Sequence, residues 1–431
     1  MPPARWGPCP SRRGVLTAAL GLAALASPPV VGRARPRLVV VGGGAAGASL
    51  VGAVAATGAV DVTLVEPEAA LFACFRSNLV LGGLTSLAAI TYPYARLADR
   101  LGARHVRARA AAIDREARAV VLAGGERLAY DRLVVAPGIA LDWDGVPGWG
   151  RAAAQAMPHA FRGRDQFVRL AGQLAAVPDG GLVVILPPPD PSRCPPAPYE
   201  RASMIAHTLK ASGRERCHIV IVDCKERFSK MALFLDGWER HFPAMIEWLP
   251  PSIHGGVRRV DPGTMTVETD FETYRGCALV NVIPAQTAGR IASAAGLADA
   301  TGFCPVDAAS MASAHDPTVF VLGDAASAGD MPKSAFAAWS QAEVASAAIL
   351  AGLAGTSPPP ARYASTCWSL VDAGDGVKVT GAYAPRDGRI AEIASFVSGL
   401  DEDAPVRAGT AAEADLWYAA MLDGLFSGRE R

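Results

Sequence analysis

The stretch RLVVVGGGAAG, residues 37–47, decides the fold. Its first five residues form a β-branched run that is typical of a strand buried on both faces of a parallel sheet. They lead into Gly42, Gly44 and Gly47, which have the GxGxxG spacing. The first glycine permits a tight turn, the second lets a pyrophosphate approach the backbone, and the third allows close packing of the next helix. The pattern predicts a dinucleotide-binding fold, and the alternative is a glycine turn in an α/β domain without a nucleotide.

The segment after the glycines supports the nucleotide interpretation. A predicted helix from Ala48 to Thr57 leads to a second strand, Val62–Val65, which ends in Glu66. Glu66 lies nineteen residues beyond Gly47. A carboxylate at this point can accept hydrogen bonds from both ribose hydroxyls of an adenosine.

A distant segment favours FAD over NAD. The predicted strand 318–322 ends in Gly323 and Asp324. This pattern resembles the distal FAD motif of flavoproteins with two dinucleotide-binding domains, in which such an aspartate holds the ribityl chain. The alternative is an acid that caps the next helix. Because the two half-motifs occur in the correct order, FAD is the expected cofactor.

The middle of the chain predicts a second nucleotide-type fold that does not bind a nicotinamide cofactor. The strand 182–186 is followed by a loop, 187–196, that contains six prolines and no glycine. Proline has no amide proton for a phosphate and cannot adopt positive φ. A cysteine, Cys194, lies in this loop instead, and a helix running through Lys210 begins near Tyr199. The alternative for Cys194 is a packed thiol.

The N-terminus predicts export. Arg12 and Arg13 precede an apolar run that ends in the small-x-small triplet 24–26, as in a cleaved twin-arginine signal, 1–26. A membrane anchor is the alternative, but the run is shorter than the roughly 20 residues that span a bilayer. We therefore expect an oxidising periplasm and no stable membrane span. The 41 basic and 41 acidic residues balance, which argues against a nucleic-acid partner.

Several segments, four of which contain a cysteine, resemble segments of a known family. They are Phe72–Asn78, Arg193–Ser203 and Thr366–Ser369, together with Trp238–Arg240, Met245–Trp248, Phe303–Asp307 and Met331–Ser334. All are similar to segments of the flavoprotein subunit of flavocytochrome c sulfide dehydrogenase. The resemblance covers essentially the whole mature chain. It implies a sulfide dehydrogenase whose substrate is hydrosulfide and whose partner is a c-type cytochrome subunit.

The resemblance also implies roles for three cysteines. Cys74 matches the residue that binds FAD covalently through its 8α-methyl group. Cys194 and Cys367 match a redox-active disulfide beside the flavin, and attack on such a disulfide is the natural first step for hydrosulfide. Without the resemblance, Cys367 would be interpreted as a buried structural thiol. Cysteines 217, 224, 277 and 304 are predicted to be unpaired, while Cys9 leaves with the signal. No cysteine has haem-attachment or zinc-site spacing, so we expect no metal site in this chain.

Three further residues have two possible roles each. Glu200 is a candidate proton acceptor, or a first-turn glutamate that stabilises its helix. Lys333 either places positive charge near the pyrimidine ring of the reduced flavin or is a solvated residue before a helix. Trp417 lies near the flavin or the partner, or packs in the core.

The predicted fold class is α/β, with two Rossmann-like dinucleotide-binding domains of the glutathione-reductase type and a small C-terminal α+β domain. The expected FAD-binding domain comprises 36–150 and 281–355, the second nucleotide-fold domain 151–280, and the C-terminal domain 356–431. The expected reaction is the oxidation of sulfide to zero-valent sulfur or polysulfide. The alternatives are a periplasmic sulfide:quinone oxidoreductase and a flavoprotein subunit without sulfide turnover of its own.

Overall fold

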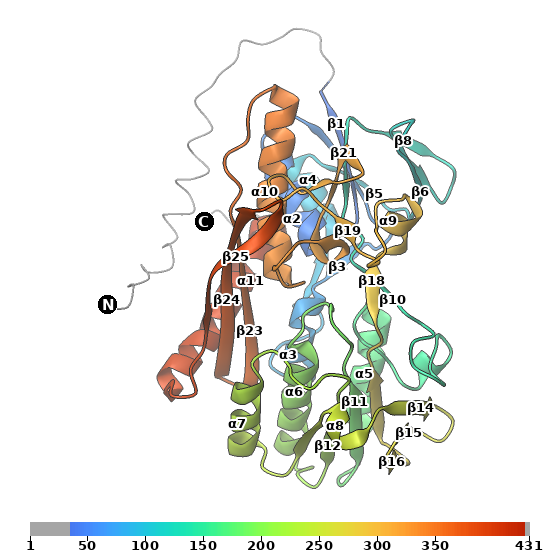
Figure 1. The fold of residues 1–431 in the computed structure, drawn as a ribbon, viewed down its shortest axis with the longest axis vertical. Helices are drawn as coiled ribbons and strands as arrows, with labels where there is room; N and C mark the ends of the chain where they lie inside the picture. The colour runs from blue at the N-terminus through green and yellow to red at the C-terminus, as the bar shows by residue number, and fades with distance from the viewer. Residues whose placement is uncertain (1–34, 427–431) are drawn as a thin grey trace. The chain divides into compact units, whose positions relative to one another are not determined.

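The computed structural model describes residues 35–426 (Figure 1). The predicted signal, 1–26, and Cys9 lie outside the described residues. Residues 36–426 belong to one compact unit, and the domain boundaries within it remain predictions.

The first sheet is built around β1 (Arg37–Val41), as the β-branched run predicts. β1 lies between β2 (Asp61–Val65) and β9 (Arg132–Val135) and pairs in parallel with both. The remaining strands of this sheet are β5 (Arg104–Val106), β21 (Asp316–Val321) and the antiparallel edge strand β20 (Ala312–Ser313). The carboxyl ends of β1 and β21 therefore meet at the same edge of the sheet, which brings the glycine loop close to Gly323 and Asp324.

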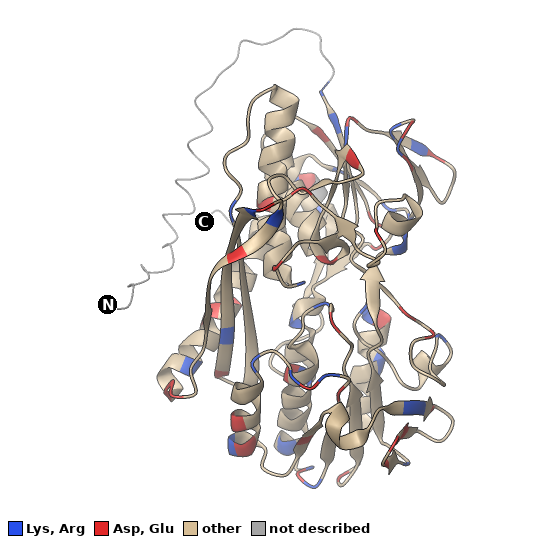
Figure 2. Cartoon of the chain, viewed as in Figure 1, with Lys and Arg blue, Asp and Glu red and all other residues tan. Residues whose placement is uncertain are grey.

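Two apolar helices pack against each other beside this sheet. α2 (Ala45–Ala55) begins directly after Gly44, three residues earlier than the sequence predicts. α10 (Ala335–Ala354) contacts α2 and begins at the capping residue Ser334. The sequence of α10 contains one charged residue, Glu343, and its ribbon is mostly tan in Figure 2. The helix is long and apolar enough to cross a bilayer. Half of its most apolar window is buried inside the protein, as in a core helix.

Smaller elements complete the first part of the chain. They are β3 (Ala70–Phe72), η1 (Cys74–Arg76), α3 (Ser77–Leu81), β4 (Thr91–Pro93), α4 (Tyr94–Leu101), β6 (Ala110–Asp114), β7 (Ala119–Leu122), β8 (Arg127–Ala129), β10 (Ile139–Leu141) and η2 (Ala153–Gln155). The return to the first sheet after the second one contains β18 (Gln286–Ala288), α9 (Arg290–Ala294), β19 (Cys304–Pro305), η3 (Gly323–Ala325) and β22 (Ala326–Ser327).

The second sheet is parallel and has the order β13-β12-β11-β17. Its strands are β11 (Leu182–Leu186), β12 (His218–Val222), β13 (Ile246–Leu249) and β17 (Leu279–Val282). The helices of this part are α5 (Arg164–Ala176), α6 (Ala197–Ala211), α7 (Met231–His241) and α8 (Pro251–His254), and a small antiparallel sheet joins β14 (Val257–Asp261), β15 (Thr266–Thr269) and β16 (Thr273–Tyr274). Two Rossmann-like sheets are thus present, which confirms the predicted fold class.

The C-terminal part is an antiparallel sheet with one long helix. β23 (Tyr363–Asp372), β24 (Asp375–Arg386) and β25 (Arg389–Val397) pair in sequence order, and α11 (Ala404–Phe426) contacts β24 and β23. Near the start of β23, the Ala364 amide donates to Ser340 Oγ of α10 at 2.9 Å.

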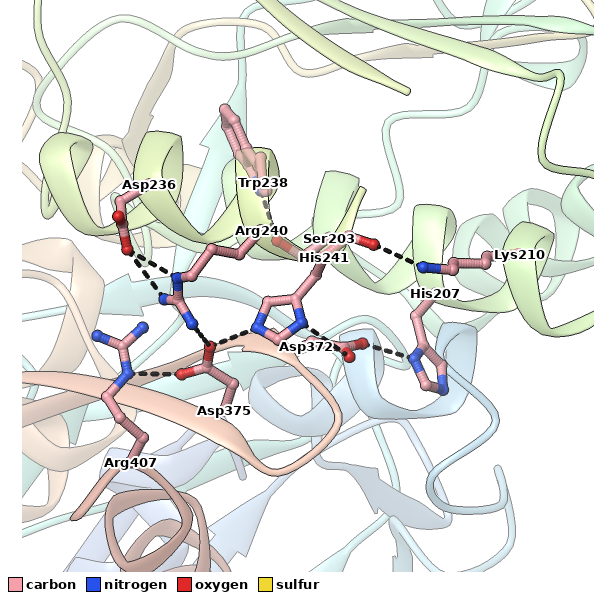
Figure 3. A network of polar contacts seen from close by, with 10 residues as sticks. All are labelled: Ser203, His207, Lys210, Asp236, Trp238, Arg240, His241, Asp372, Asp375 and Arg407. Carbon is pink, nitrogen blue, oxygen red and sulfur yellow. Dashed lines mark hydrogen bonds and ion pairs between the residues drawn. The ribbon is translucent and has the colours of Figure 1, made fainter. Parts of the chain in front are cut away.

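A polar network holds the far end of β23 (Figure 3). Asp372 accepts a hydrogen bond from His207 of α6 at 2.7 Å and faces His241 of α7 at 3.6 Å. Asp375 contacts His241 at 2.7 Å and Arg407 of α11 at 2.5 Å. The turn between β23 and β24 is therefore fastened to both the second domain and the C-terminal helix.

Candidate active site

A cavity that opens to solvent, with about 1100 Å³ of empty space including that at its mouth, contains most of the predicted site. Its walls come from the glycine loop, the segment after β3, the loop after β11, the start of α6 and the end of β21. The predicted residues that line it are Gly42, Gly44, Glu66, Cys74, Cys194, Glu200 and Asp324. Segments from 42 to 338 in the sequence thus meet around one space.

The glycine loop fits a dinucleotide. A Cβ atom at Gly47 would lie 1.9 Å from the carbonyl oxygen of Gly42, so only glycine lets α2 pack this closely. A Cβ atom at Gly44 would meet nothing within 4 Å, because that position faces open space at the cavity. Since the first turn of α2 has no side-chain cap, its amides are available to an anion such as a pyrophosphate.

The two predicted acids lie on the cavity wall and already have partners. Glu66 accepts from the Gly43 amide at 2.9 Å, which places its carboxylate beside the glycine loop. Asp324 accepts from Arg193 Nε at 2.6 Å, and the Arg193 guanidinium also donates to the Phe161 carbonyl at 2.8 Å. Asp324 therefore links the FAD-type motif to the loop that carries Cys194.

Cys74 opens the short helix η1 and lines the cavity. The next residue, Phe75, stacks on Tyr418 of α11 with ring centroids 5.3 Å apart. Trp417 belongs to the same group of rings and stacks on Phe336 at 4.5 Å, while Trp368 lies 5.6 Å away. Trp417 thus packs in an aromatic cluster beside the cysteine-bearing strand β23.

Folding brings Cys194 and Cys367 together although 173 residues separate them. The structure holds both as free cysteines, and their side chains share a hydrogen bond. This bond raises the pKa of Cys194 and lowers the pKa of Cys367. The pair therefore loses its first proton more easily than its second. Cys194 lines the cavity, and Cys367 is buried behind it on β23.

The Cys194 turn has an unusual backbone. Cys194 adopts φ 49°, a left-handed conformation that is uncommon for a residue with a side chain. Its amide donates to the Lys333 carbonyl at 2.7 Å, and the Arg193 amide donates to Gln286 Oε1 at 2.8 Å. The surrounding structure therefore fixes a strained turn that aims this sulfur at the cavity.

Glu200 lies in the first turn of α6 and joins three parts of the chain. Its carboxylate accepts from Asn78 Nδ2 at 2.8 Å and from the Leu370 amide of β23 at 2.9 Å. Loss of solvent raises its pKa more than these bonds lower it. A raised pKa suits a proton acceptor that works near neutral pH.

Lys333 is not the solvated lysine that one sequence interpretation suggests. Its ammonium donates to the carbonyls of Asp324 and Ala326 at 2.8 Å each and lies 3.8 Å from the Phe303 ring centroid. Burial lowers its pKa to about 8. Lys333 lines a smaller cavity with Gly323 and Ser334 and does not line the large one.

Sequence reasoning missed two buried cations beside the cysteines. Arg201 is 2% exposed, donates to Asn281 Oδ1 at 2.7 Å and to Asn78 Oδ1 at 3.3 Å, and has its pKa lowered to about 10 by burial. Lys230 donates to the carbonyl of Cys367 at 2.8 Å. Arg201 lies within the segment Arg193–Ser203 that carries the resemblance, but nothing in that segment assigns it a role, and Lys230 lies in no motif.

The nucleotide crevice of the second sheet is occupied by side chains. Asp223, at the end of β12, accepts from Tyr199 at 2.5 Å and from Trp248 at 2.9 Å. Tyr199 also stacks on Phe228 with centroids 3.7 Å apart, and Lys225 donates to the Pro188 carbonyl at 2.6 Å. Asp223 stands where a dinucleotide fold has its ribose-binding acid, but its carboxylate is buried and already bonded, which speaks against nicotinamide binding.

The other described cysteines carry no disulfide in the structure. Cys217, Cys277 and Cys304 are buried, and burial raises the pKa of Cys304 to about 12. Cys224 is exposed. Within residues 35–426 no cluster of histidine, cysteine or acidic side chains has a geometry that could hold a metal ion.

Among solved structures, the chain is similar to sulfide:quinone oxidoreductase from the hyperthermophilic bacterium Aquifex aeolicus. The identity is 18%, the TM-score is 0.69, and the match covers 91% of this chain and 92% of that one. Putidaredoxin reductase, in its complex with putidaredoxin, matches at 19% identity with a TM-score of 0.66 over 91% and 94% of the chains. An NAD-dependent persulfide reductase from A. fulgidus matches at 16% identity with a TM-score of 0.62 over 90% and 77%. These likenesses show the fold.

Family models identify the domains. Residues 36–168 match the pyridine nucleotide-disulphide oxidoreductases, and residues 168–284 match the central domain of the sulfide dehydrogenase (flavocytochrome c) flavoprotein chain. Residues 359–426 match the flavin-binding domain of flavocytochrome c sulphide dehydrogenase. The protein is accordingly a flavin-dependent oxidoreductase that acts on sulfur compounds, with FAD as its cofactor. The predicted resemblance to the flavoprotein subunit of flavocytochrome c sulfide dehydrogenase is thereby confirmed, because two models of that chain match the central and the C-terminal parts of this one.

Proposed function

We propose that this protein oxidises hydrosulfide to zero-valent sulfur or polysulfide at a Cys194–Cys367 disulfide and passes the electrons to a c-type cytochrome subunit. One observation carries the proposal. Two cysteines from distant segments meet at the wall of a cavity that also contains a dinucleotide loop and Cys74.

The residues of the chain have separate tasks in this reaction. Gly44, Glu66 and Asp324 would hold FAD, and Cys74 would attach it covalently. Bound FAD can accept an electron pair and release the two electrons one at a time. Hydrosulfide attacks the disulfide, which leaves one sulfur as a persulfide and the other as a thiolate. Glu200 accepts the proton that hydrosulfide brings.

The cellular location belongs to the same proposal. A twin-arginine signal would export the folded protein with its cofactor to the periplasm. There the cysteine pair would be kept oxidised between turnovers by electron flow to the cytochrome. N-terminal sequencing of protein from a periplasmic fraction would find residue 1 if the signal is retained and a start near residue 27 if it is removed.

The direct test mixes the purified protein with sulfide in the absence of oxygen. Bleaching of the flavin absorbance within seconds, followed by recovery on addition of a c-type cytochrome, is the expected result. A flavin that stays oxidised at millimolar sulfide would instead identify the chain as a flavoprotein subunit without sulfide turnover of its own.

One structural feature supports a second candidate function, that of a sulfide:quinone oxidoreductase. Several large apolar side chains of the C-terminal part are exposed, as in a surface that contacts a membrane. They are Ile393, Phe396, Val397, Leu400 and Leu416. Faster reoxidation of the bleached flavin by a soluble quinone than by cytochrome c would favour this candidate.

A further inference from the structure

Lys230 reaches from the second domain to the strand that carries Cys367. Its side chain is 8% exposed, and its ammonium donates to the Cys367 carbonyl at 2.8 Å and to Ser369 Oγ at 2.9 Å. Neither acceptor carries a charge, so these bonds do not neutralise the lysine. Lys230 also has a left-handed backbone, with φ 62°. Strained residues of this kind gather at functional sites, and Cys194, whose φ is 49°, is another one.

The positive charge of Lys230 acts on three titratable groups. Lys230 lowers the pKa of Cys194, of Cys367 and of Glu200, although other causes are larger for each. The other ionisable side chains that interact with the pair are Arg193, Arg201, Tyr383 and Tyr418. Both tyrosines are neutral near pH 7, because burial raises their pKa values.

The helix that follows Cys194 does not supply the same charge. Helix N-termini stabilise thiolates through free amides. In α6, however, the Ala197 amide donates to the Cys194 carbonyl at 2.8 Å, Pro198 has no amide proton, and the Tyr199 amide donates to the Pro196 carbonyl at 3.2 Å. Stabilisation of a negative sulfur therefore falls to a side chain.

We propose that Lys230 is a positioning residue whose fixed positive charge stabilises the thiolate released when the Cys194–Cys367 disulfide opens, a role that rests on the proposed function. In that step the hydrosulfide sulfur forms a bond to one cysteine sulfur and the bond between the two cysteine sulfurs breaks. The electron pair of the broken bond stays on the other cysteine as a thiolate. A negative charge thus appears beside the largely buried Lys230 and Cys367, where solvent screens a nearby cation less than at the surface. Stabilising the thiolate also makes the disulfide easier to reduce.

The test measures thiol ionisation in the reduced protein and needs no sulfide. Wild type and Lys230→Gln are reduced with dithiothreitol, freed of it and alkylated with iodoacetamide from pH 5 to 10. Peptide mass spectrometry then reports each cysteine separately. Glutamine keeps hydrogen bonding to the Cys367 carbonyl without the charge. We expect the alkylation midpoint of the pair to rise by about one pH unit, which makes alkylation at pH 7 about tenfold slower.

Four controls separate charge from structure. Lys230→Arg keeps the charge and should titrate within about 0.3 units of wild type, well inside the shift that a lost charge causes. Lys210→Gln removes another lysine of this domain that donates to a backbone carbonyl, that of His241 at 2.9 Å, and should change nothing. Cys224 is exposed and serves as an internal standard in every sample. Ser369→Asp neutralises the same charge with the lysine in place and covers the case in which Lys230→Gln does not fold.

The outcomes decide between the ideas. An unchanged midpoint in folded Lys230→Gln, or an equal shift in Lys230→Arg and Lys230→Gln, would overturn the role of Lys230. Failure of the proposed function has a different signature, because the wild-type flavin would then not bleach with sulfide whatever the thiols do.

Discussion

Replacement of Gly44 by alanine should separate FAD binding from folding. Gly44 has φ −65° and ψ −168°, which alanine adopts without strain, and an added Cβ would meet no atom within 4 Å. The unliganded variant should therefore be as stable as wild type or more stable by roughly 0.4–1 kcal/mol, because alanine restricts the unfolded chain. The methyl group would occupy the space through which a pyrophosphate approaches. We expect at least a tenfold loss of FAD affinity, which corresponds to about 1.4 kcal/mol.

Gly47→Ala is the matched comparison. Its Cβ would lie 1.9 Å from the Gly42 carbonyl oxygen, and α2 cannot move away without leaving the sheet. This variant should lose about 3 kcal/mol of stability or fail to fold. The assay is urea unfolding of apoprotein and FAD titration, both in a Cys74→Ser background so that no covalent bond hides a loss of affinity. Normal FAD affinity in Gly44→Ala, or equal destabilisation of both variants, would refute the assignment of this loop to the pyrophosphate.

Four other outcomes are expected. Acid precipitation should leave the flavin in the protein pellet, and Cys74→Ser should release it to the supernatant; free flavin from wild type would contradict the covalent bond. Cys194→Ser or Cys367→Ser should abolish sulfide-dependent bleaching with FAD retained, whereas a merely structural bridge would cost about 2–5 kcal/mol of stability and spare the chemistry. NADH should not reduce the flavin, and saturable reduction at micromolar NADH would contradict the filled crevice. Burial lowers the pKa of His159 to about 3, so its contribution to the free energy of unfolding should be fully present above about pH 6.5 and decline as the pH drops toward 3. In His159→Asn the amide oxygen can still accept from the Phe161 amide, and the free energy of unfolding, measured by chemical denaturation, should depend less on pH over this range.

The parts of the site that sequence could predict are those with local causes. The glycine spacing after β1 follows from the turn and from close helix packing, both of which act within ten residues. Glu66 and Asp324 could be placed because parallel strands bring their carboxyl ends to one edge. The proline loop excluded a phosphate site through properties of single residues. Each of these inferences needs only the residue type and its neighbours along the chain.

The rest of the site depends on contacts between distant segments. Lys230 is one of several charged residues before an ordinary helix, and its burial beside Cys367 depends on how β23 crosses the second domain. The Asn78 to Glu200 bond joins residues 122 apart. The start of α2 was missed by three residues because Gly44, and not a later residue, ends the turn. For Lys333 the sequence left open a solvated position, since nothing in it announces the two carbonyls that bind the ammonium.

The fastening of β23 at both ends has a consequence for the catalytic cycle. One end is tied to α10 through Ser340, and the other is tied to α6 and α7 through Asp372, with Cys367 between them. A strand held in this way would keep its backbone in place when the proposed disulfide at Cys367 opens. Turnover then needs only rotation of side chains, so the rate of sulfide oxidation should depend little on solvent viscosity and should not wait for the movement of whole domains.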